Sequence, residues 1–145
     1  MADYLLDSNI LIFHLRDNPE ATALLARWGE RGTLFISVAT RTEILAGMRP
    51  HEEDTTMALL DSLISLPVDA AIADRAGRMI YQYARQGITF SFADAVIAAT
   101  ALQHDLTLAT GNSKHFPVPD LRVHPFGYPP AASPAGSPPA GFVAE

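Results

Sequence analysis

The sequence predicts an α/β sandwich, in which helices cover a mainly parallel sheet. Short apolar runs alternate along the chain with longer segments whose apolar residues recur at helical spacing. Strands that alternate with helices pair in parallel and are joined by right-handed crossovers. The first apolar run, residues 4–6, ends abruptly in the carboxylate of Asp7. Ligands of open α/β sheets bind at the carboxyl ends of strands, so we expect Asp7 at that edge.

Short apolar segments bounded by polar or turn residues are expected as strands. The third of them is weak and short, and the last is of the edge type. The expected strands are residues 4–6, 33–36, 66–68, 106–109 and 121–124.

The helices are expected where apolar residues follow a period of about 3.6 residues. Pro19 suits the first turn of a helix that Gly29 and Gly32 close, and Gly87 suits a helix stop. The expected helices are residues 10–15, 19–28, 37–48, 52–66, 69–85 and 91–104, with Leu59, Leu60, Leu63 and Ile64 facing inward in the fourth.

Composition and length favour one domain. The chain has 145 residues, is 48% hydrophobic and carries no Cys, which excludes disulfides and thiolate zinc sites. We expect one domain over residues 1–128 and a disordered Pro/Ala/Gly-rich tail over residues 129–145. No signal sequence or membrane span is expected, and a cytoplasmic location is the default. The net charge of −6 argues against a broad basic nucleic-acid face but not against a nuclease that holds cations.

Three acidic residues stand out because each lies in an apolar setting near an expected helix start. They are Asp7, Glu43 and Asp94. Helix capping explains each of them alone, since Thr40-x-x-Glu43 and Ser91-x-x-Asp94 both fit a capping box. This alternative stays open for each acid taken singly.

Taken together, the acids favour a metal site. Carboxylates are seldom buried without a partner, and neither Glu43 nor Asp94 has a Lys or Arg four residues on, where Gly47 and Ala98 stand. A divalent cation would neutralise them, and Mg²⁺ or Mn²⁺ prefers oxygen ligands. The sequence therefore predicts an Mg²⁺ or Mn²⁺ site with Asp7 as its anchor.

Polar residues near the same predicted edge can support that site. Ser8 and Asn9 follow Asp7, and Thr110 and Asn112 follow the strand at residues 106–109. An ordinary Thr-Gly-Asn-Ser turn is the competing explanation for the second pair. His115 is not expected as a ligand, because no paired His spacing accompanies it.

Four motifs, in order, resemble those of PIN domains, and specifically of VapC-type toxins of bacterial type II toxin–antitoxin systems. The similarity covers about residues 3–126. The motifs are Leu5-Leu6-Asp7-Ser8-Asn9-Ile10, Ser37-x-x-Thr40-x-x-Glu43-Ile44-x-x-Gly47, Phe92-Ala93-Asp94-Ala95-x-Ile97-Ala98-Ala99, and Leu108-x-Thr110-x-Asn112-x-x-His115-Phe116.

The resemblance implies a PIN-like three-layer α/β/α sandwich with a central, mainly parallel twisted sheet of about four to five strands. It also implies an Mg²⁺- or Mn²⁺-dependent endoribonuclease, a VapB-type antitoxin partner and a homodimer that forms a hetero-oligomer with the antitoxin. Asp7, Glu43 and Asp94 match the family's acidic metal-site positions. The chain departs from the family at Asn112 and His115, where many members have Asp, which puts a second metal ion in doubt.

The RNA expected as substrate is structured cellular RNA such as tRNA or rRNA, read through its single-stranded parts. Arg16, Arg41, Arg49 and Lys114 are candidate RNA contacts, and a solvated charged face is the alternative. Two other functions stay open. A catalytically silent PIN-fold binding module is one, and an aspartate-dependent phosphatase is the other, although the second acid of such enzymes would stand at Asn9.

Apolar residues of two expected helices exceed what a small core obviously needs. They could form a dimer face or an antitoxin groove, and core packing is the alternative. The residues are Leu24, Leu25, Trp28, Leu59, Leu60, Leu63 and Ile64.

Overall fold

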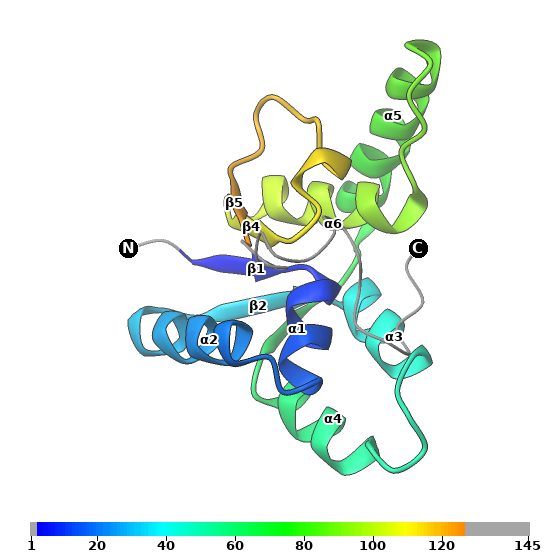
Figure 1. Cartoon of the computed structure of the whole chain (residues 1–145). Coiled ribbons are helices and arrows are strands. Elements are labelled where there is room, and N and C mark those ends of the chain that lie inside the picture. Colours follow the sequence, from blue (N-terminus) through cyan, green and yellow to red (C-terminus); the bar gives the residue numbers. More distant parts are fainter. Residues whose placement is uncertain (1–2, 127–145) are drawn as a thin grey trace.

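The computed structural model describes residues 3–126, which form a five-stranded parallel sheet flanked by helices (Figure 1). The strand order is β3-β2-β1-β4-β5. The predicted tail, residues 129–145, lies outside the described residues. The strands are β1 (Tyr4–Leu6), β2 (Leu34–Ser37), β3 (Ile64–Leu66), β4 (Thr107–Thr110) and β5 (Val123–Pro125).

Most of the helices begin at a side chain that caps their first turn. Asp7, Asn18, Ser37, Asp69 and Ser91 each accept a hydrogen bond from a backbone N–H at the start of the helix that follows. The helices are α1 (Ser8–Leu15), α2 (Pro19–Arg31), α3 (Val38–Ala46), α4 (Glu53–Asp61), α5 (Ala70–Arg85) and α6 (Phe92–Gln103), with a 3₁₀ turn η1 (Ser113–His115).

Two apolar cores lie on the two faces of the sheet, which confirms the predicted three-layer sandwich. On one face, α5 and α6 pack against Leu5 of β1 and Leu108 of β4. On the other, α1 and α2 pack against Leu6 of β1 and Ile36 of β2. Figure 1 shows these layers, with α5 and α6 above the sheet and α1, α2 and α4 below it. Neighbouring β1 residues point to opposite faces, so the central strand contributes to both cores.

The helix predicted over residues 52–66 is wrong at its C-terminal end. α4 ends at Asp61, and residues 64–66 form β3, which pairs in parallel with β2 through Phe35 and Ile64. Ile64 therefore does not face the core from a helix, and 48% of it is exposed. The apolar spacing of this segment fits a helix locally, but strand pairing at the edge of the sheet decides its conformation. The strand expected at residues 66–68 accordingly lies slightly earlier in the chain.

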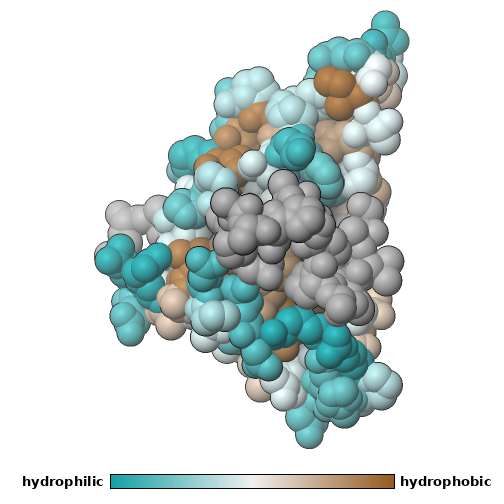
Figure 2. All heavy atoms as spheres, in the orientation of Figure 1, coloured by the Kyte–Doolittle hydropathy of each residue, from teal (hydrophilic) through white to brown (hydrophobic). Residues whose placement is uncertain are grey.

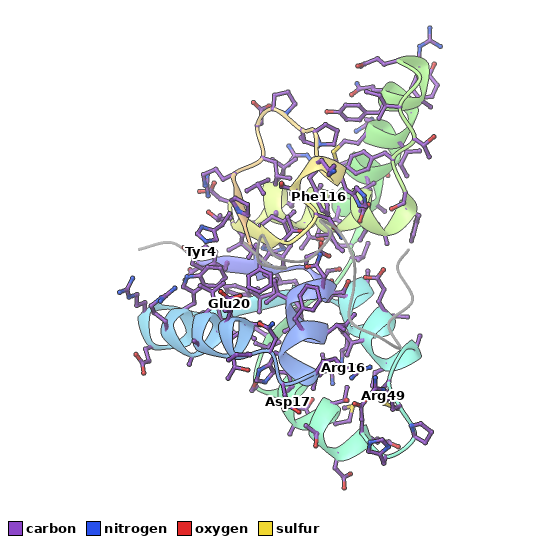
Figure 3. The ribbon with its side chains drawn as sticks, viewed as in Figure 1. Tyr4, Arg16, Asp17, Glu20, Arg49 and Phe116 are labelled. Carbon is purple, nitrogen blue, oxygen red and sulfur yellow. The ribbon has the colours of Figure 1, made fainter. Side chains whose placement is uncertain are left out.

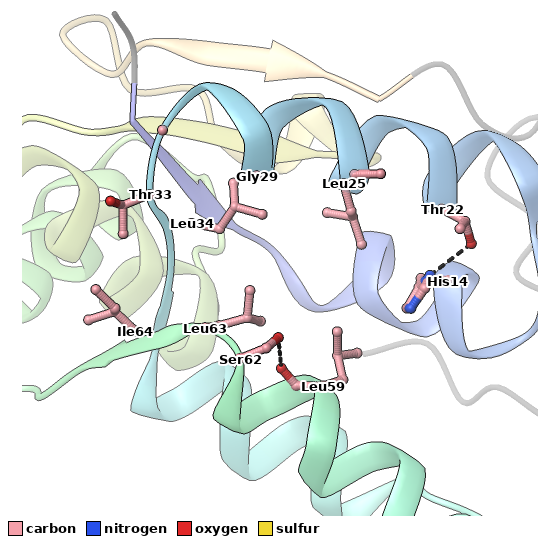
Figure 4. A pocket seen from close by; sticks show the side chains of 12 residues that line it. His14, Thr22, Leu25, Gly29, Thr33, Leu34, Leu59, Ser62, Leu63 and Ile64 are labelled. Carbon is pink, nitrogen blue, oxygen red and sulfur yellow. Dashed lines mark hydrogen bonds between the residues drawn. The ribbon is translucent and has the colours of Figure 1, made fainter.

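Core packing explains most of the apolar surplus of α2 and α4. Trp28, Leu25 and Leu60 are buried, and the Trp28 ring stacks on Tyr4 with centroids 4.0 Å apart. A groove of about 550 Å³ remains between α2, the start of β2 and the end of α4 (Figure 4). Leu59, Leu63 and Ile64 lie along one side of it. The homodimer stays a prediction.

The order in which strands are added to the sheet reverses at β1. The chain moves from β1 outward to β2 and β3, and then returns to place β4 on the other side of β1. Since the strands are parallel, the carboxyl ends of β1 and β4 meet at this switch point, which is where open α/β sheets bind ligands. Asp7 follows β1 there, and Thr110 ends β4.

Candidate active site at the carboxyl edge of the sheet

Asp7 is held at the switch point by hydrogen bonds to both of its carboxylate oxygens. Ser8 donates its backbone N–H to Oδ1 at 2.8 Å, and Thr110 donates its hydroxyl to Oδ2 at 2.6 Å. The backbone N–H of Asp7 continues the sheet by donating to the carbonyl of Ala109 at 2.9 Å. Only 5% of Asp7 is exposed. Asp7 therefore caps α1 and also presents a fixed, nearly buried carboxylate, so the cap and the site are compatible.

The turn after β4 is fixed by the amide of Asn9. Asn9 Oδ1 accepts a hydrogen bond from the backbone N–H of Gly111 at 3.1 Å, and Thr110 Oγ1 accepts one from the N–H of Asn112 at 3.0 Å. A Cβ atom on Gly111 would lie 3.2 Å from Asn9 Nδ2. The predicted supporting residues Ser8, Asn9 and Thr110 thus form one network around Asp7, and the backbone of Asn112 joins it.

Asp94 lies in the first turn of α6, which begins at the same edge of the sheet. Its backbone N–H donates to the Ser91 hydroxyl at 3.1 Å, so the hydroxyl half of the predicted capping box is present. Its side chain is 18% exposed, and Oδ2 lies 3.8 Å from Nδ1 of His115. A groove of about 260 Å³ opens beside Asp94, between residues 88–91 and residues 114–117. The carboxylate is therefore accessible from this groove.

Glu43 lies in the interior of α3, which removes the capping explanation for it. Ser37, and not Thr40, caps this helix by accepting the backbone N–H of Ala39 at 3.0 Å. Thr40 is fully buried one turn before Glu43, and its hydroxyl has no hydrogen-bond partner within residues 3–126. Oε1 of Glu43 is buried as well. α3 packs against both α1 and α6, the helices that follow Asp7 and carry Asp94, and a shared site of Glu43 with these two acids stays a prediction.

The donor set fits a hard divalent cation in its chemistry. Asp7, Glu43 and Asp94 carry carboxylate oxygens, and the Thr110 hydroxyl is bound to Asp7. Within the described residues, however, no three His, Cys, Asp or Glu side chains are grouped closely enough to hold a metal ion. The three acids thus lie on or beside helices that pack against one another, and their shared ligation of a metal remains a prediction.

The candidate RNA contacts Arg16 and Arg41 have partners within the protein, and Arg49 also interacts with Glu52. Arg16 donates to Glu52 at 2.8 Å, with both side chains largely buried, and Figure 3 shows Arg16 and Arg49 near α4. Arg41 donates to Asp61 at 2.8 Å and to the Ser65 hydroxyl at 3.2 Å.

Lys114 differs from these arginines, because it is exposed and lines the groove beside Asp94. None of these RNA contacts is tested by the geometry, and they stay predictions. Of the candidates, Lys114 is the cation that lies along the same groove as a predicted site carboxylate.

Sequence reasoning missed two features of this edge. One is the bond between Asn9 and Gly111, which the Thr-Gly pair after β4 could have signalled, because a Gly there permits close approach of a side chain. The other is the approach of His115 to Asp94. The sequence does not predict His115 as a ligand, because no paired His spacing accompanies it, and no sequence pattern indicates that it lies near Asp94.

Comparison with known proteins identifies the family. The PIN domain model matches residues 4–120. The chain belongs to the PIN domain family. Over 125 residues it is 40% identical to "Ribonuclease VapC10" of Mycobacterium tuberculosis, an alignment that covers 86% of this chain and 94% of the relative. It is 29% identical over 122 residues to "tRNA(fMet)-specific endonuclease VapC" of Shigella flexneri, with 80% of this chain and 91% of the relative covered. The resemblance to VapC ribonucleases is thereby confirmed.

Solved PIN-domain structures agree with this assignment. A toxin–antitoxin complex from Klebsiella pneumoniae matches at 30% identity with a TM-score of 0.72, over 85% of this chain and 98% of that one. A VapBC2 structure from Rickettsia felis, bound to a DNA fragment from its promoter, has a TM-score of 0.76 at 22% identity, over 86% of this chain and 98% of that one. This second likeness shows the fold alone. In residues 3–126 of this PIN domain, no helix is long and apolar enough to span a membrane.

Proposed function

We propose that this PIN-domain protein is an endoribonuclease toxin that hydrolyses RNA phosphodiester bonds and is neutralised by a VapB-type antitoxin. The observation that carries the proposal is the nearly buried Asp7 carboxylate, held at the switch point by Thr110, with Glu43 and Asp94 on neighbouring elements. Its similarity to VapC ribonucleases along most of the chain supports the activity. Structured cellular RNA such as tRNA or rRNA is the proposed substrate.

Asp7 and Asp94 are the proposed main ligands of Mg²⁺ or Mn²⁺, and Glu43 is a further ligand or positions water. When bound, such a cation lowers the pKa of a water molecule and offsets charge on the leaving oxygen. Thr110 and the backbone of Ser8 orient the Asp7 carboxylate, so both of its oxygens keep fixed directions. The proposed products carry 5′-phosphate and 3′-hydroxyl ends. Water is the proposed nucleophile, so no side-chain nucleophile is needed.

The proposed setting is the bacterial cytoplasm, where RNA and antitoxin are both present. The Klebsiella pneumoniae structure is a toxin–antitoxin complex, which supports an antitoxin partner for this chain. We further propose a homodimer that binds antitoxin as a hetero-oligomer. Light scattering coupled to size-exclusion chromatography measures the mass of the free and bound protein directly.

Cleavage of total cellular RNA by the purified full-length chain tests the proposed activity. We expect cleavage with Mg²⁺ or Mn²⁺, and its loss on chelation. Asp7→Asn and Asp94→Asn are expected to lower the rate at least about 100-fold, because each removes a charged ligand. Asp74→Asn is the matched control, since Asp74 is exposed on α5. Undiminished cleavage by both site variants would show that the assignment is wrong.

A PIN-fold binding module without catalytic activity is the second candidate. Two observations favour it: Asn112 and His115 stand where many family members have Asp, and no three acidic or His side chains within residues 3–126 form a ready metal group. A wild-type protein that binds RNA but leaves it intact in every metal would establish this function. Mapping cleavage ends on total RNA separates the two outcomes.

A further inference from the structure

Phe92 is an exposed aromatic residue beside the candidate active site. It is the first residue of α6, the helix that carries Asp94, and 73% of it is exposed. This is the largest exposed fraction among the large apolar side chains of residues 3–126. A ring so exposed stabilises the fold little, because it buries little apolar area. Folding therefore does not explain why an aromatic residue stands two positions from a site carboxylate.

The groove beside Asp94 lies next to Phe92 in the sequence. Ser91 and Asp94, which flank Phe92 in the sequence, both line the groove. Lys114 and His115 line it as well, from the turn that follows β4. A cation, an imidazole and a carboxylate of the proposed site thus line one opening, and Phe92 follows directly after Ser91 at its rim without lining it.

The remainder of α6 does not extend Phe92 into an apolar face. Residues 95–101 are all buried within the protein. The face of the molecule in Figure 2 carries apolar and hydrophilic areas side by side. A stable protein interface needs about 800 Å² from each partner and an apolar centre. Ile88, which is 39% exposed, also lines the groove, but one exposed ring and one half-exposed aliphatic side chain suit the stacking of a single nucleobase, which needs one π-face.

We propose that Phe92 is a substrate-positioning residue that stacks on a base next to the scissile phosphate. The inference rests on the proposed ribonuclease function. In this arrangement Lys114 contacts a backbone phosphate along the groove, while Phe92 fixes the neighbouring base. Stacking requires an unpaired base, since bases within a duplex already stack on each other.

The two contacts have different signatures. Loss of the Phe92 ring is expected to raise KM about 5- to 100-fold and leave the salt dependence of binding unchanged, because stacking involves no counterion release. Lys114→Ala is expected to lower the slope of log Kd against log salt by about 0.7, the value for one phosphate contact to a single strand. If Phe92 had a purely structural role, its loss would not raise KM while leaving the salt dependence of binding unchanged.

The experiment uses a single-stranded RNA oligonucleotide with 2-aminopurine at successive positions around a mapped cleavage site. With a chelator present, binding to the full-length wild type is expected to change 2-aminopurine fluorescence at one position through stacking. Phe92→Trp should keep that change, and Phe92→Leu, which keeps the apolar bulk, should lose it. Tyr81→Ala is the matched control, because Tyr81 is a 63% exposed aromatic residue on α5.

Several outcomes would overturn the inference. Unchanged KM and fluorescence in Phe92→Leu would do so, as would a conversion of a wild-type dimer to monomers in that variant, which would place the ring in a protein interface. Failure of the proposed function is recognised separately, since then the wild type itself cleaves no RNA with Mg²⁺ or Mn²⁺. The fluorescence measurement is made with a chelator present and needs no turnover, so it reports stacking separately from cleavage.

Discussion

The hydroxyl of Thr110 donates a 2.6 Å hydrogen bond to Oδ2 of Asp7, and this bond joins the ends of two adjacent parallel strands. Both residues are buried, and the bond lies at the point where the strand order reverses. A carboxylate oxygen held in this way keeps its direction, and residues that orient metal ligands commonly matter about as much as the ligands themselves.

Thr110→Val removes the hydroxyl and keeps the shape of the side chain. We expect about a 10- to 100-fold loss of metal-dependent RNA cleavage, because the Asp7 carboxylate loses its orientation. We also expect the free energy of unfolding to fall by about 1–3 kcal/mol. Cleavage rates and urea unfolding measure the two effects. Thr110→Ser keeps the hydroxyl and should retain most of the activity, and equal loss in both variants would contradict this role for the bond.

Gly111→Ala tests the close approach of Asn9 to the turn after β4. The new Cβ atom would lie 3.2 Å from Asn9 Nδ2, so the amide must shift and its bond to the Gly111 backbone weakens. We expect a loss of about 1 kcal/mol in the free energy of unfolding and reduced cleavage. In an Asn9→Ala background the same substitution should cost less. A double-mutant cycle that gives no coupling free energy between positions 9 and 111 would show that the Cβ atom does not act through Asn9.

Glu52 ties the end of α1 to the start of α4. Its pKa is lowered from 4.5, first by the hydrogen bond from the backbone N–H of Arg49 and then by the charge of Arg16, while partial burial opposes the shift. Because the pKa is lower in the folded protein, its stabilisation is present above about pH 4.5 and is lost as the pH falls through the folded value.

Glu52→Gln is accordingly expected to be less stable than the wild type at neutral pH, with a smaller difference in acid. Urea unfolding between pH 7 and pH 3 measures it. Glu30→Gln, at an exposed position of α2, is the control and should follow the wild type. A Glu52→Gln deficit that stays constant down to the lowest pH would contradict the linkage to this carboxylate.

Metal binding should be visible without catalysis. We expect Mn²⁺ at about 100 times its Kd to raise the free energy of unfolding by about 2.7 kcal/mol, and chelation to reverse the effect. Asp7→Ala should abolish the heat of Mn²⁺ binding in calorimetry, whereas Asp74→Ala should not. If the wild type binds no Mn²⁺, the proposed metal site is wrong and the binding-module function is favoured.

The positions of Asp7 and Thr110 could be predicted from the alternation of strands and helices. This alternation implies a parallel sheet, in which the carboxyl ends of the two strands beside these residues lie at the same edge. The assignment of residues 64–66 could not, since Ile64 and its neighbours satisfy a helical pattern and only pairing with β2 makes them a strand. Likewise, the sequence predicts a capping box at Thr40-x-x-Glu43, whereas Ser37 caps α3. The choice between them depends on where β2 ends, which is a property of the sheet.

The pairing of β1 with β4 also sets the stage of synthesis at which the proposed site can form. Asp7 emerges from the ribosome early. Its partner Thr110, at the end of β4 (Thr107–Thr110), is 103 residues further along the chain and emerges much later. A nascent chain that lacks β4 has no neighbour on that side of β1, and no hydroxyl to orient Asp7. Premature termination or proteolysis before β4 should therefore yield harmless fragments, and translation itself delays the assembly of the site until the fold is nearly complete.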